Sequence, residues 1–218
     1  MSTIAIINYN MGNLHSVTKA LEHVAPEGTQ VILSASANEI LAADRVVFPG
    51  QGAARDCMQE LKKSNLVDVV REAASSKPFL GICMGMQVLL ERSEEHNGID
   101  CIGLYKGHTH SFAGRIPAKD SAGERLKIPQ MGWNRISQTQ AEHPLWKGIP
   151  DNSRFYFVHS YFVAPEDQSL EAGMTNYGIN YASAIAKDNV FAIQAHPEKS
   201  ADNGLQLLKN FTKWNGNS

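Results

Sequence analysis

The chain has 218 residues, of which 43% are hydrophobic, so it can bury the core of one ordinary α/β domain and is short for two enzyme-sized domains. We therefore expect a single domain over residues 1–218. The formal net charge of −2 comes from acidic and basic residues mixed along the chain, which argues against the strong field that attracts nucleic acid or an anionic membrane. Because the amino terminus carries neither a basic segment nor an apolar run of about 20 residues, the sequence predicts a cytoplasmic protein.

The first half of the chain alternates short apolar runs with longer segments of helical period, which predicts an α/β fold with an open, mostly parallel sheet covered by helices. Candidate strands span 3–7, 30–33, 45–48 and 79–82, and candidate helices span 13–24, 53–62, 66–75 and 84–92. From about residue 99 the periodicity weakens, and aromatic runs at 155–158 and 190–193 predict additional, partly antiparallel strands. A last helix is expected over 201–214.

The cysteines and histidines give no sign of a disulfide framework or a metal site. Cys57, Cys83 and Cys101 are odd in number and widely spaced, and none belongs to a Cys-x-x-Cys pair. His108 and His110 are the only histidines close enough to suggest a metal, and the stretch around them lacks further cysteine or carboxylate ligands. We expect no metal and no cofactor, and one of the cysteines is a candidate for chemistry.

Cys83 lies in the segment Gly81-Ile82-Cys83-Met84-Gly85, between a predicted strand and a predicted helix. Glycines at these two offsets are typical of a nucleophile elbow, a strained turn that exposes its central side chain above the sheet. The positive end of the following helix favours the thiolate form of a cysteine there. Free cysteines are also often buried as small apolar side chains, but the paired glycines favour a nucleophile.

A thiolate that attacks an amide needs a base that later returns a proton to the leaving group, and the base needs a group that orients it. The segment His196-Pro197-Glu198 supplies both after a predicted strand, at the sheet edge where ligands usually bind. Taken alone, this segment is equally compatible with an ordinary turn between a strand and a helix. The presence of Cys83 elsewhere in the sequence is what favours a catalytic role for this segment.

The negative oxygen that forms during such an attack needs backbone N–H donors. The amide of Met84, directly after the nucleophile, is the natural first donor. A second donor must come from another loop, and Pro49-Gly50-Gln51-Gly52 follows the third predicted strand with glycines that permit unusual peptide orientations. A simple turn before a helix is the alternative interpretation of this loop.

These motifs, in this order, resemble the class I (triad) glutamine amidotransferases: PGQG at Pro49, GICMGMQ around Cys83 and HPE at His196. More narrowly, four motifs are similar to the glutaminase subunits of imidazole glycerol phosphate synthases, namely YNMGN near Tyr9, QMGWN near Met131, FYFVHSYF near Tyr156 and QAHPEKS near His196. The resemblance covers nearly all of 4–211. It implies a flavodoxin-like α/β sheet with helices on both faces, extended by antiparallel strands, in one glutamine amidotransferase domain.

The resemblance implies a Cys-His-Glu triad in which Cys83 is the nucleophile, His196 the general base and acid, and Glu198 the carboxylate that orients His196. The positions expected around the oxyanion are Gly50, Gln51 and Met84. The positions expected to bind the substrate glutamine are Gly52, Gln87 and Glu95.

The same resemblance implies a heterodimer with a (β/α)8-barrel cyclase, which uses the ammonia to make imidazole glycerol phosphate and AICAR in histidine biosynthesis. The positions expected near that interface are Asn13, Trp133, Tyr156 and Lys199. As alternatives, Trp133 is compatible with a core aromatic residue and Lys199 with a solvated residue beside a helix start.

Asn8 and Ala195 depart from the family pattern, which often has Asp and usually Phe at these positions. The smaller Ala195 is expected to loosen packing under His196. Such departures leave open a paralogue that feeds ammonia to a related barrel in a different pathway, such as surface-sugar amidation. A class I glutaminase that serves another synthase, such as those of pyridoxal phosphate, anthranilate or guanylate synthesis, is a second interpretation, which the QMGWN and HPEKS motifs disfavour. A non-catalytic regulatory α/β domain is a third interpretation, which the complete triad disfavours.

Overall fold

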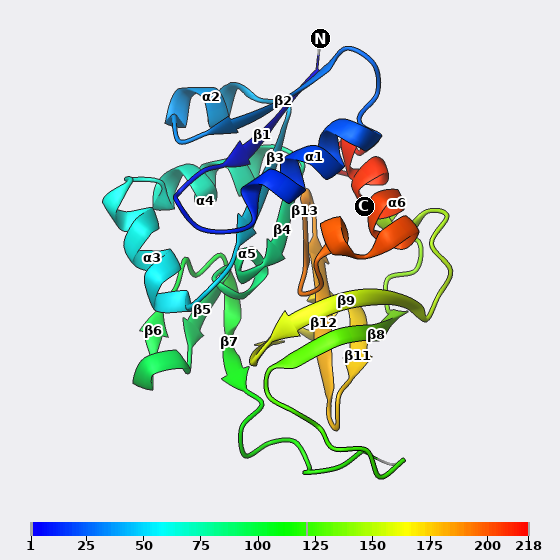
Figure 1. Ribbon diagram of the computed structural model, residues 1–218. Coiled ribbons are helices and arrows are strands. Elements are labelled where there is room, and N and C mark those ends of the chain that lie inside the picture. The colour runs from blue at the N-terminus through cyan, green and yellow to red at the C-terminus, as the bar shows by residue number, and fades with distance from the viewer. Residues whose placement is uncertain (1, 121, 218) are drawn as a thin grey trace.

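The computed structural model describes residues 2–120 and 122–217. Within these residues, thirteen strands form one mixed sheet (Figure 1). The strands are β1 (Ser2–Ile7), β2 (Thr29–Ser34), β3 (Arg45–Gly50), β4 (Phe79–Cys83), β5 (Leu90–Ser93), β6 (Ile99–Asp100), β7 (Tyr105–Ser111), β8 (Gln130–Gln138), β9 (Ser153–His159), β10 (Tyr161–Pro165), β11 (Glu171–Asn176), β12 (Asn180–Lys187) and β13 (Val190–Ile193). The α-helices are α1 (Leu14–Val24), α2 (Ala37–Ala42), α3 (Ala54–Lys63), α4 (Val67–Ser76), α5 (Met84–Gln87) and α6 (Ala201–Lys213). Short 3₁₀ helices are η1 (Glu95–Asn97), η2 (Pro144–Trp146), η3 (Gln168–Leu170) and η4 (Pro197–Lys199).

The sheet has a parallel part and an antiparallel part. Five parallel strands lie in the order β2-β1-β3-β4-β13, and β7 and β5 form a further parallel pair at the other end of the sheet. Beyond β13 the pairing becomes antiparallel through β12, β10 and β7, and a second branch runs from β12 through β11 and β8 to β9. The predicted α/β class, with a parallel sheet extended by antiparallel strands, is therefore confirmed.

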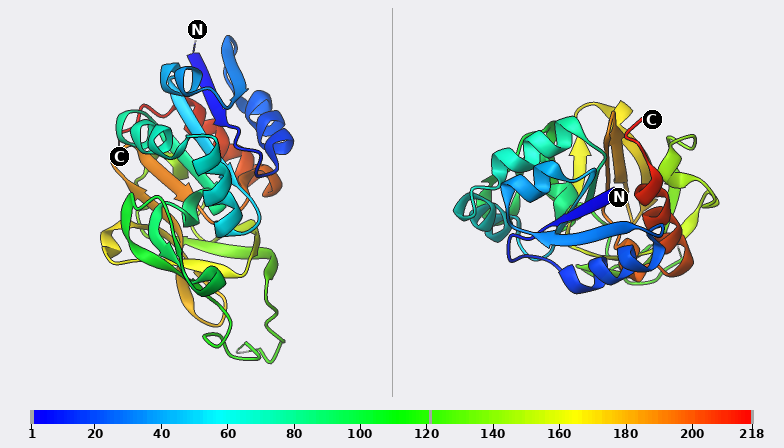
Figure 2. Two further views of the ribbon diagram at one scale, coloured as in Figure 1. Left: turned by 90° about the vertical axis from the view of Figure 1, so that its left-hand side faces the viewer. Right: turned by 90° about the horizontal axis from the view of Figure 1, so that it is seen from above.

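Helices cover both faces of the parallel part. Figure 2 shows, viewed from above, α3 and α4 on one side of the sheet and α1 and α6 on the other. Side chains alternate between the two layers: Leu80 and Ile82 pack in the layer of α1 and α6, whereas Phe79 packs in the layer of α2, α3 and α4. Full burial of a side chain such as Phe79 stabilises the fold by about 1.5–3 kcal/mol. The helices are too short or too polar to span a membrane, as judged over the described residues.

One predicted helix is wrong. The helix expected over 84–92 ends after one turn at Gln87, and the chain continues into β5. The carbonyl groups of Val88 and Leu89, which would accept bonds from the next helical turn, instead accept them from the backbone amides of Ile102 and Leu104. Both side chains are fully buried, so this segment lacks the polar face of a surface helix. Long-range pairing therefore overrides the local pattern.

The other strands and helices expected by their local pattern are present within about two residues of the predicted bounds. The short helix α2 is an addition that the local pattern does not predict. The carboxyl ends of β3, β4 and β13 meet at one edge, with Gly50 opposite Cys83 and Ile193 opposite Ile82 in the ladders. This register gathers the candidate residues at the sheet edge.

Candidate active site

Cys83 ends β4 with φ 56° and ψ −110°, a backbone conformation that a residue other than glycine adopts only under strain. The flanking glycines allow the turn. A Cβ atom on Gly81 would lie 2.8 Å from the carbonyl oxygen of Gly85, and a Cβ atom on Gly85 would overlap the carbonyl oxygen of Phe48. A side chain at either position would force α5 away from the sheet. The geometry is that of the predicted nucleophile elbow.

The helix after the elbow is shorter than expected, which changes the electrostatics around Cys83. A helix macrodipole sums over aligned peptide groups, and α5 contains only one turn of them. Cys83 is also buried, with 5% of its surface exposed. A thiolate in this position therefore needs hydrogen-bond donors or positive charge from other elements.

His196 follows β13 and provides such a charge. Nδ1 of His196 donates a hydrogen bond of 2.9 Å to Oε1 of Glu198, and both side chains are almost completely buried. Burial alone lowers the pKa of His196, but the negative charge of Cys83 and the bond to Glu198 outweigh burial and raise this pKa to about 10. Nε2 is buried without a hydrogen-bond partner in the described part of the chain, so it remains available for proton transfer to a substrate.

Hydrogen bonds to β9, one direct and one through the side chain of Ser200, hold the His196 turn in place. The amide of His196 donates to the carbonyl of Tyr156 at 2.9 Å. The amide of Tyr156 donates to Oγ of Ser200 at 2.9 Å, and this hydroxyl donates in turn to the carbonyl of His196 at 2.6 Å. The position of His196 is therefore tied directly to the antiparallel branch of the sheet.

The predicted oxyanion loop lies against the elbow. Gly50 is directly opposite Cys83 in the β3–β4 ladder. A Cβ atom on Gly50 would lie 2.8 Å from Cβ of Met84, so only glycine fits between β3 and α5. Gln51 and Gly52 follow as exposed residues. The structure thus brings Gly50, Gln51 and Met84 together with Cys83, while their role in binding an oxyanion stays a prediction.

A cleft of about 360 Å³ opens beside Cys83. Besides Cys83, the predicted site residues that line it are Gln51, Gly52, Met84, Gln87 and Glu95. Pro129 and residues 158–161 complete the lining. The sequence predicts no site role for this last segment, although it belongs to the FYFVHSYF motif, because its position at the end of an antiparallel strand is set by long-range pairing.

Glu95 connects the cleft with α3. Its carboxylate accepts a hydrogen bond from the amide of Ala54, at the start of a helix that has no side-chain cap of its own. The amide of Glu95 donates to Oγ of Ser93 at 3.2 Å. The carboxylate of Glu95 thus accepts a hydrogen bond from a backbone amide at the start of α3 that has no partner within the helix, and the same residue lines the cleft.

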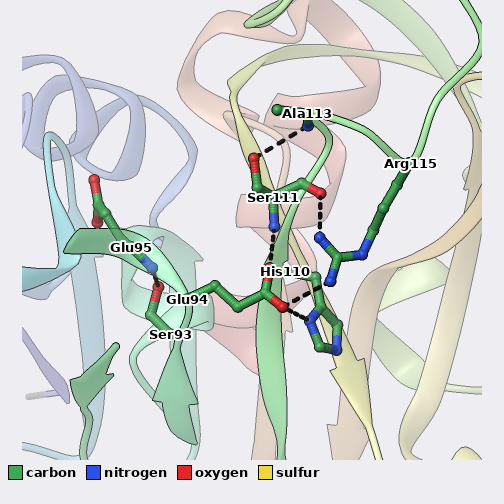
Figure 3. Close-up of polar contacts among 7 residues, drawn as sticks. All are labelled: Ser93, Glu94, Glu95, His110, Ser111, Ala113 and Arg115. Atoms are coloured by element: carbon green, nitrogen blue, oxygen red, sulfur yellow. Dashed lines mark hydrogen bonds and ion pairs between the residues drawn. The ribbon is translucent and has the colours of Figure 1, made fainter. Parts of the chain in front are cut away.

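The neighbouring Glu94 anchors this turn to β7 (Figure 3). Its carboxylate accepts hydrogen bonds from the amide of Ser111 at 3.0 Å, from Nδ1 of His110 at 2.8 Å and from Arg115 at 2.7 Å. Partial burial raises the pKa of Glu94, but these three donors outweigh it and lower the pKa to about 2. The carboxylate is therefore ionised at neutral pH. The turn that carries Glu94 and Glu95 is bonded to α3 through Glu95 and to β7 through Glu94.

The rings of His108 and His110 lie 6.0 Å apart, and His110 is engaged by Glu94. Over the residues that the structure describes, no group of three or more potential ligands surrounds a possible metal position.

The four residues predicted at the partner interface lie on adjoining elements. Trp133 is 45% exposed and therefore does not belong to the core. Its ring stacks edge-on against that of Tyr156, directly opposite on the neighbouring strand, with centroids 6.0 Å apart. Lys199 is exposed in η4, which contacts both β9 and α1, and Asn13 caps the start of α1. The elements that carry these residues contact one another, and the role of the four residues in docking stays a prediction.

Comparison with known proteins identifies the family. The family model described as Glutamine amidotransferase class-I matches residues 5–214. The chain is 53% identical to "Imidazole glycerol phosphate synthase subunit HisH" of Hydrogenovibrio crunogenus (98% of this chain, 97% of the relative). It is 54% identical to the HisH of Aromatoleum aromaticum (98% and 99%) and 53% identical to "HisH 1" of Pseudomonas aeruginosa (99% and 99%).

Solved structures share the fold at low sequence identity. PurLQS from Thermotoga maritima matches with a TM-score of 0.69 and 16% identity, covering 97% of this chain and 98% of that chain. The glutaminase domain of CTPS from Trypanosoma brucei matches with a TM-score of 0.60 and 14% identity, covering 98% of this chain and 94% of that chain. With its fold, its motifs and these relatives, the chain belongs to the class I glutamine amidotransferase family.

Proposed function

We propose that this chain is the glutaminase subunit of an imidazole glycerol phosphate synthase and that Cys83, His196 and Glu198 form its catalytic triad. One observation carries the triad: the Glu198 carboxylate holds Nδ1 of His196 at 2.9 Å, which leaves Nε2 free beside a strained, buried Cys83. Relatives named as this subunit, at about half identity over nearly the full chain, support the pathway.

The reaction follows from these positions. The thiolate of Cys83 attacks the side-chain carbonyl carbon of glutamine. Backbone N–H groups near Gln51 and Met84 donate hydrogen bonds to the negative oxygen that forms. Nε2 of His196 then gives its proton to the departing nitrogen, and ammonia leaves a γ-glutamyl thioester on Cys83. Water adds to the thioester while His196 takes its proton. Cleavage of the carbon–sulfur bond releases glutamate and restores the thiolate–imidazolium pair.

The partner in this proposal is a (β/α)8-barrel cyclase that docks on the surface around Asn13, Trp133, Tyr156 and Lys199. Ammonia passes to the cyclase, which makes imidazole glycerol phosphate and AICAR in histidine biosynthesis. The exposed Trp133 supports this choice of surface, since large exposed aromatic residues commonly mark interfaces. We further propose that residues 1–218 form one glutamine amidotransferase domain and that the protein is cytoplasmic.

Reconstitution tests the proposal. Purified chain, purified cyclase and the cyclase's nucleotide substrate are supplied with either glutamine or ammonium, and imidazole glycerol phosphate is measured. We expect glutamine to support product formation only when both proteins are present, and ammonium to support it with cyclase alone. Glutamine hydrolysis without transfer to the cyclase, together with copurification of a different synthase, would assign the chain to another pathway.

A further inference from the structure

We propose that Gln194 is a further catalytic residue, whose side-chain amide donates a hydrogen bond to the sulfur of Cys83 and stabilises the thiolate. This inference rests on the proposed role of Cys83 as the nucleophile. Nε2 of Gln194 lies 3.6 Å from Sγ of Cys83, and Gln194 is fully buried. The parallel pairing of β13 with β4 sets this distance, because Ile193 and Ile82 are partners in the ladder and the next residue of each strand follows in step.

A neighbouring glutamine determines which end of the Gln194 amide faces the sulfur. Nε2 of Gln87 donates to the carbonyl of Tyr161 at 3.1 Å and to Oε1 of Gln194 at 2.9 Å. An amide nitrogen has two N–H donors, and Gln87 commits both of them. If the Gln194 amide were inverted, its NH₂ would oppose that of Gln87 and its oxygen would repel a thiolate. Nitrogen toward Cys83 is therefore the orientation that satisfies the network.

The elbow needs this donor. Since α5 has one turn and Cys83 is buried, the thiolate receives little support from a helix dipole or from water. His196 contributes charge, but its Nε2 has no hydrogen-bond partner in the described part of the chain and its proton is consumed when ammonia leaves. Gln194 keeps its N–H throughout the reaction. It can stabilise the sulfur both before the attack and when the thioester breaks.

The arrangement also links the substrate cleft to the nucleophile. Gln87 and Tyr161 both line the cleft, whereas Gln194 lies outside its lining and hydrogen-bonds to both Gln87 and Cys83. Gln87 is then a positioning residue for Gln194 in addition to its expected contact with glutamine.

The test is the pH dependence of Cys83 alkylation by iodoacetamide in the intact chain. Mass spectrometry of the Cys83 peptide measures the rate, and the peptide with the partly exposed Cys101 serves as the internal reference. In Gln194→Met, we expect the midpoint of Cys83 alkylation to rise by about one pH unit, equal to a tenfold loss of thiolate or about 1.4 kcal/mol. The kcat/KM for glutamine should fall by about the same factor at neutral pH and recover at higher pH, which a merely structural role would not produce.

Gln130→Met is the matched control, since Gln130 is also a buried glutamine but hydrogen-bonds to Tyr181 instead of Cys83. Its alkylation midpoint should equal that of the wild type. Gln194→Leu, which also removes the donor without adding charge, should raise the midpoint by the same amount, and it serves if the methionine variant does not fold. An unchanged midpoint in a folded Gln194 variant would overturn the inference. Failure of the proposed function is distinct: glutaminase activity would then survive Cys83→Ala.

Discussion

The hydroxyl of Tyr9 donates a hydrogen bond of 2.9 Å to the carbonyl of Pro49 and would lie 2.5 Å from a Cβ atom on Gly50. The thiol of Cys57 donates to the carbonyl of Gln51 at 3.6 Å. Burial raises the pKa of Cys57 to about 12 and that of Tyr9 well above its ordinary value, so both groups keep their protons and remain donors. The two bonds hold the carbonyls on either side of the peptide between Gly50 and Gln51.

Tyr9→Phe tests whether this support matters for oxyanion binding. The change removes one hydrogen bond and preserves the ring, so we expect kcat for glutamine in the cyclase complex to fall by up to about tenfold, with a smaller change in KM. Ammonium-dependent synthesis should be unaffected. Tyr105→Phe is the control, because Tyr105 is a partly buried tyrosine on β7, away from the loop. Equal kcat values in wild type and Tyr9→Phe would show that the loop does not depend on this bond.

Cys83→Ala should abolish glutamine-dependent synthesis, since no thioester can form without the thiol. Ammonium-dependent synthesis by the complex should persist because the cyclase performs that step itself. The measurement is glutamate release from glutamine, with ammonium-driven product formation as the check on folding and docking. Glutamate release at the wild-type rate would remove Cys83 from the triad.

His196→Asn and Glu198→Gln should differ in severity. His196 transfers the protons, so its loss should be nearly as damaging as that of Cys83, at about 10⁶-fold in comparable triads. Glu198 orients the imidazole. The amide in Glu198→Gln keeps the hydrogen bond to His196 but favours the wrong tautomer of the imidazole, and the comparable change in another triad lowers kcat by about 10⁴-fold. Single-turnover measurement of thioester formation separates the two. Unimpaired formation in both variants would contradict the assignment.

The residues of the proposed triad could be singled out because each part has a local signature: glycines on both sides of Cys83, and His196 two residues before Glu198 after a strand. Gln194 has no such signature. Its amide has no chemistry of its own, and its function depends on its alignment with Cys83 across two strands that are distant in sequence. The end of α5 and the cleft segment 158–161 escaped prediction for the same reason, since pairing with remote strands sets both.

Stability should fall in mild acid because of two buried histidines. Burial lowers the pKa of His143 and of His159 to about 4, compared with about 6.5 in an unfolded chain. Between these values the unfolded chain binds two protons that the folded chain does not, so the free energy of unfolding decreases as pH falls through this range. At pH 5 each histidine should cost about 2 kcal/mol. His196 acts in the opposite sense: its contribution is present below about pH 6.5 and is lost as pH rises through about 10.

His143→Asn should remove about half of the acid-dependent loss, while the asparagine oxygen can replace Nδ1 as the acceptor for the Leu145 amide. Urea unfolding of wild type and variant at pH 7 and pH 5 measures the effect. When the change in the free energy of unfolding between pH 7 and pH 5 is compared in the two proteins, the contributions of all other titrating groups cancel. Parallel loss of stability in both would show that His143 is not the source.

Trp133→Ala should weaken docking of the cyclase by about 30-fold, since truncation of a central aromatic residue at an interface typically costs about 2 kcal/mol or more. Trp133 packs on Tyr156, and Tyr156 bonds to the backbone of His196, so the proposed docking surface lies next to the turn that carries the proposed base. Leu33→Ala is the matched control: Leu33 is also 45% exposed but lies on β2, at the opposite end of the sheet (Figure 1). Calorimetry should show a weaker Kd for Trp133→Ala alone.

The same docking should switch on glutamine hydrolysis. Loss of one oxyanion donor costs about 100- to 1000-fold in comparable sites, so a wrongly oriented Gly50–Gln51 peptide would keep the isolated chain slow while its triad is intact. The cyclase, with its nucleotide substrate bound, need favour the productive orientation by only about 3–4 kcal/mol. Glutamate release should therefore increase in the order chain alone, chain with cyclase, and complex with nucleotide. Trp133→Ala should lose this acceleration at low cyclase concentration and regain it at saturation, whereas equal rates in all three wild-type conditions would rule out the switch and leave the triad unaffected.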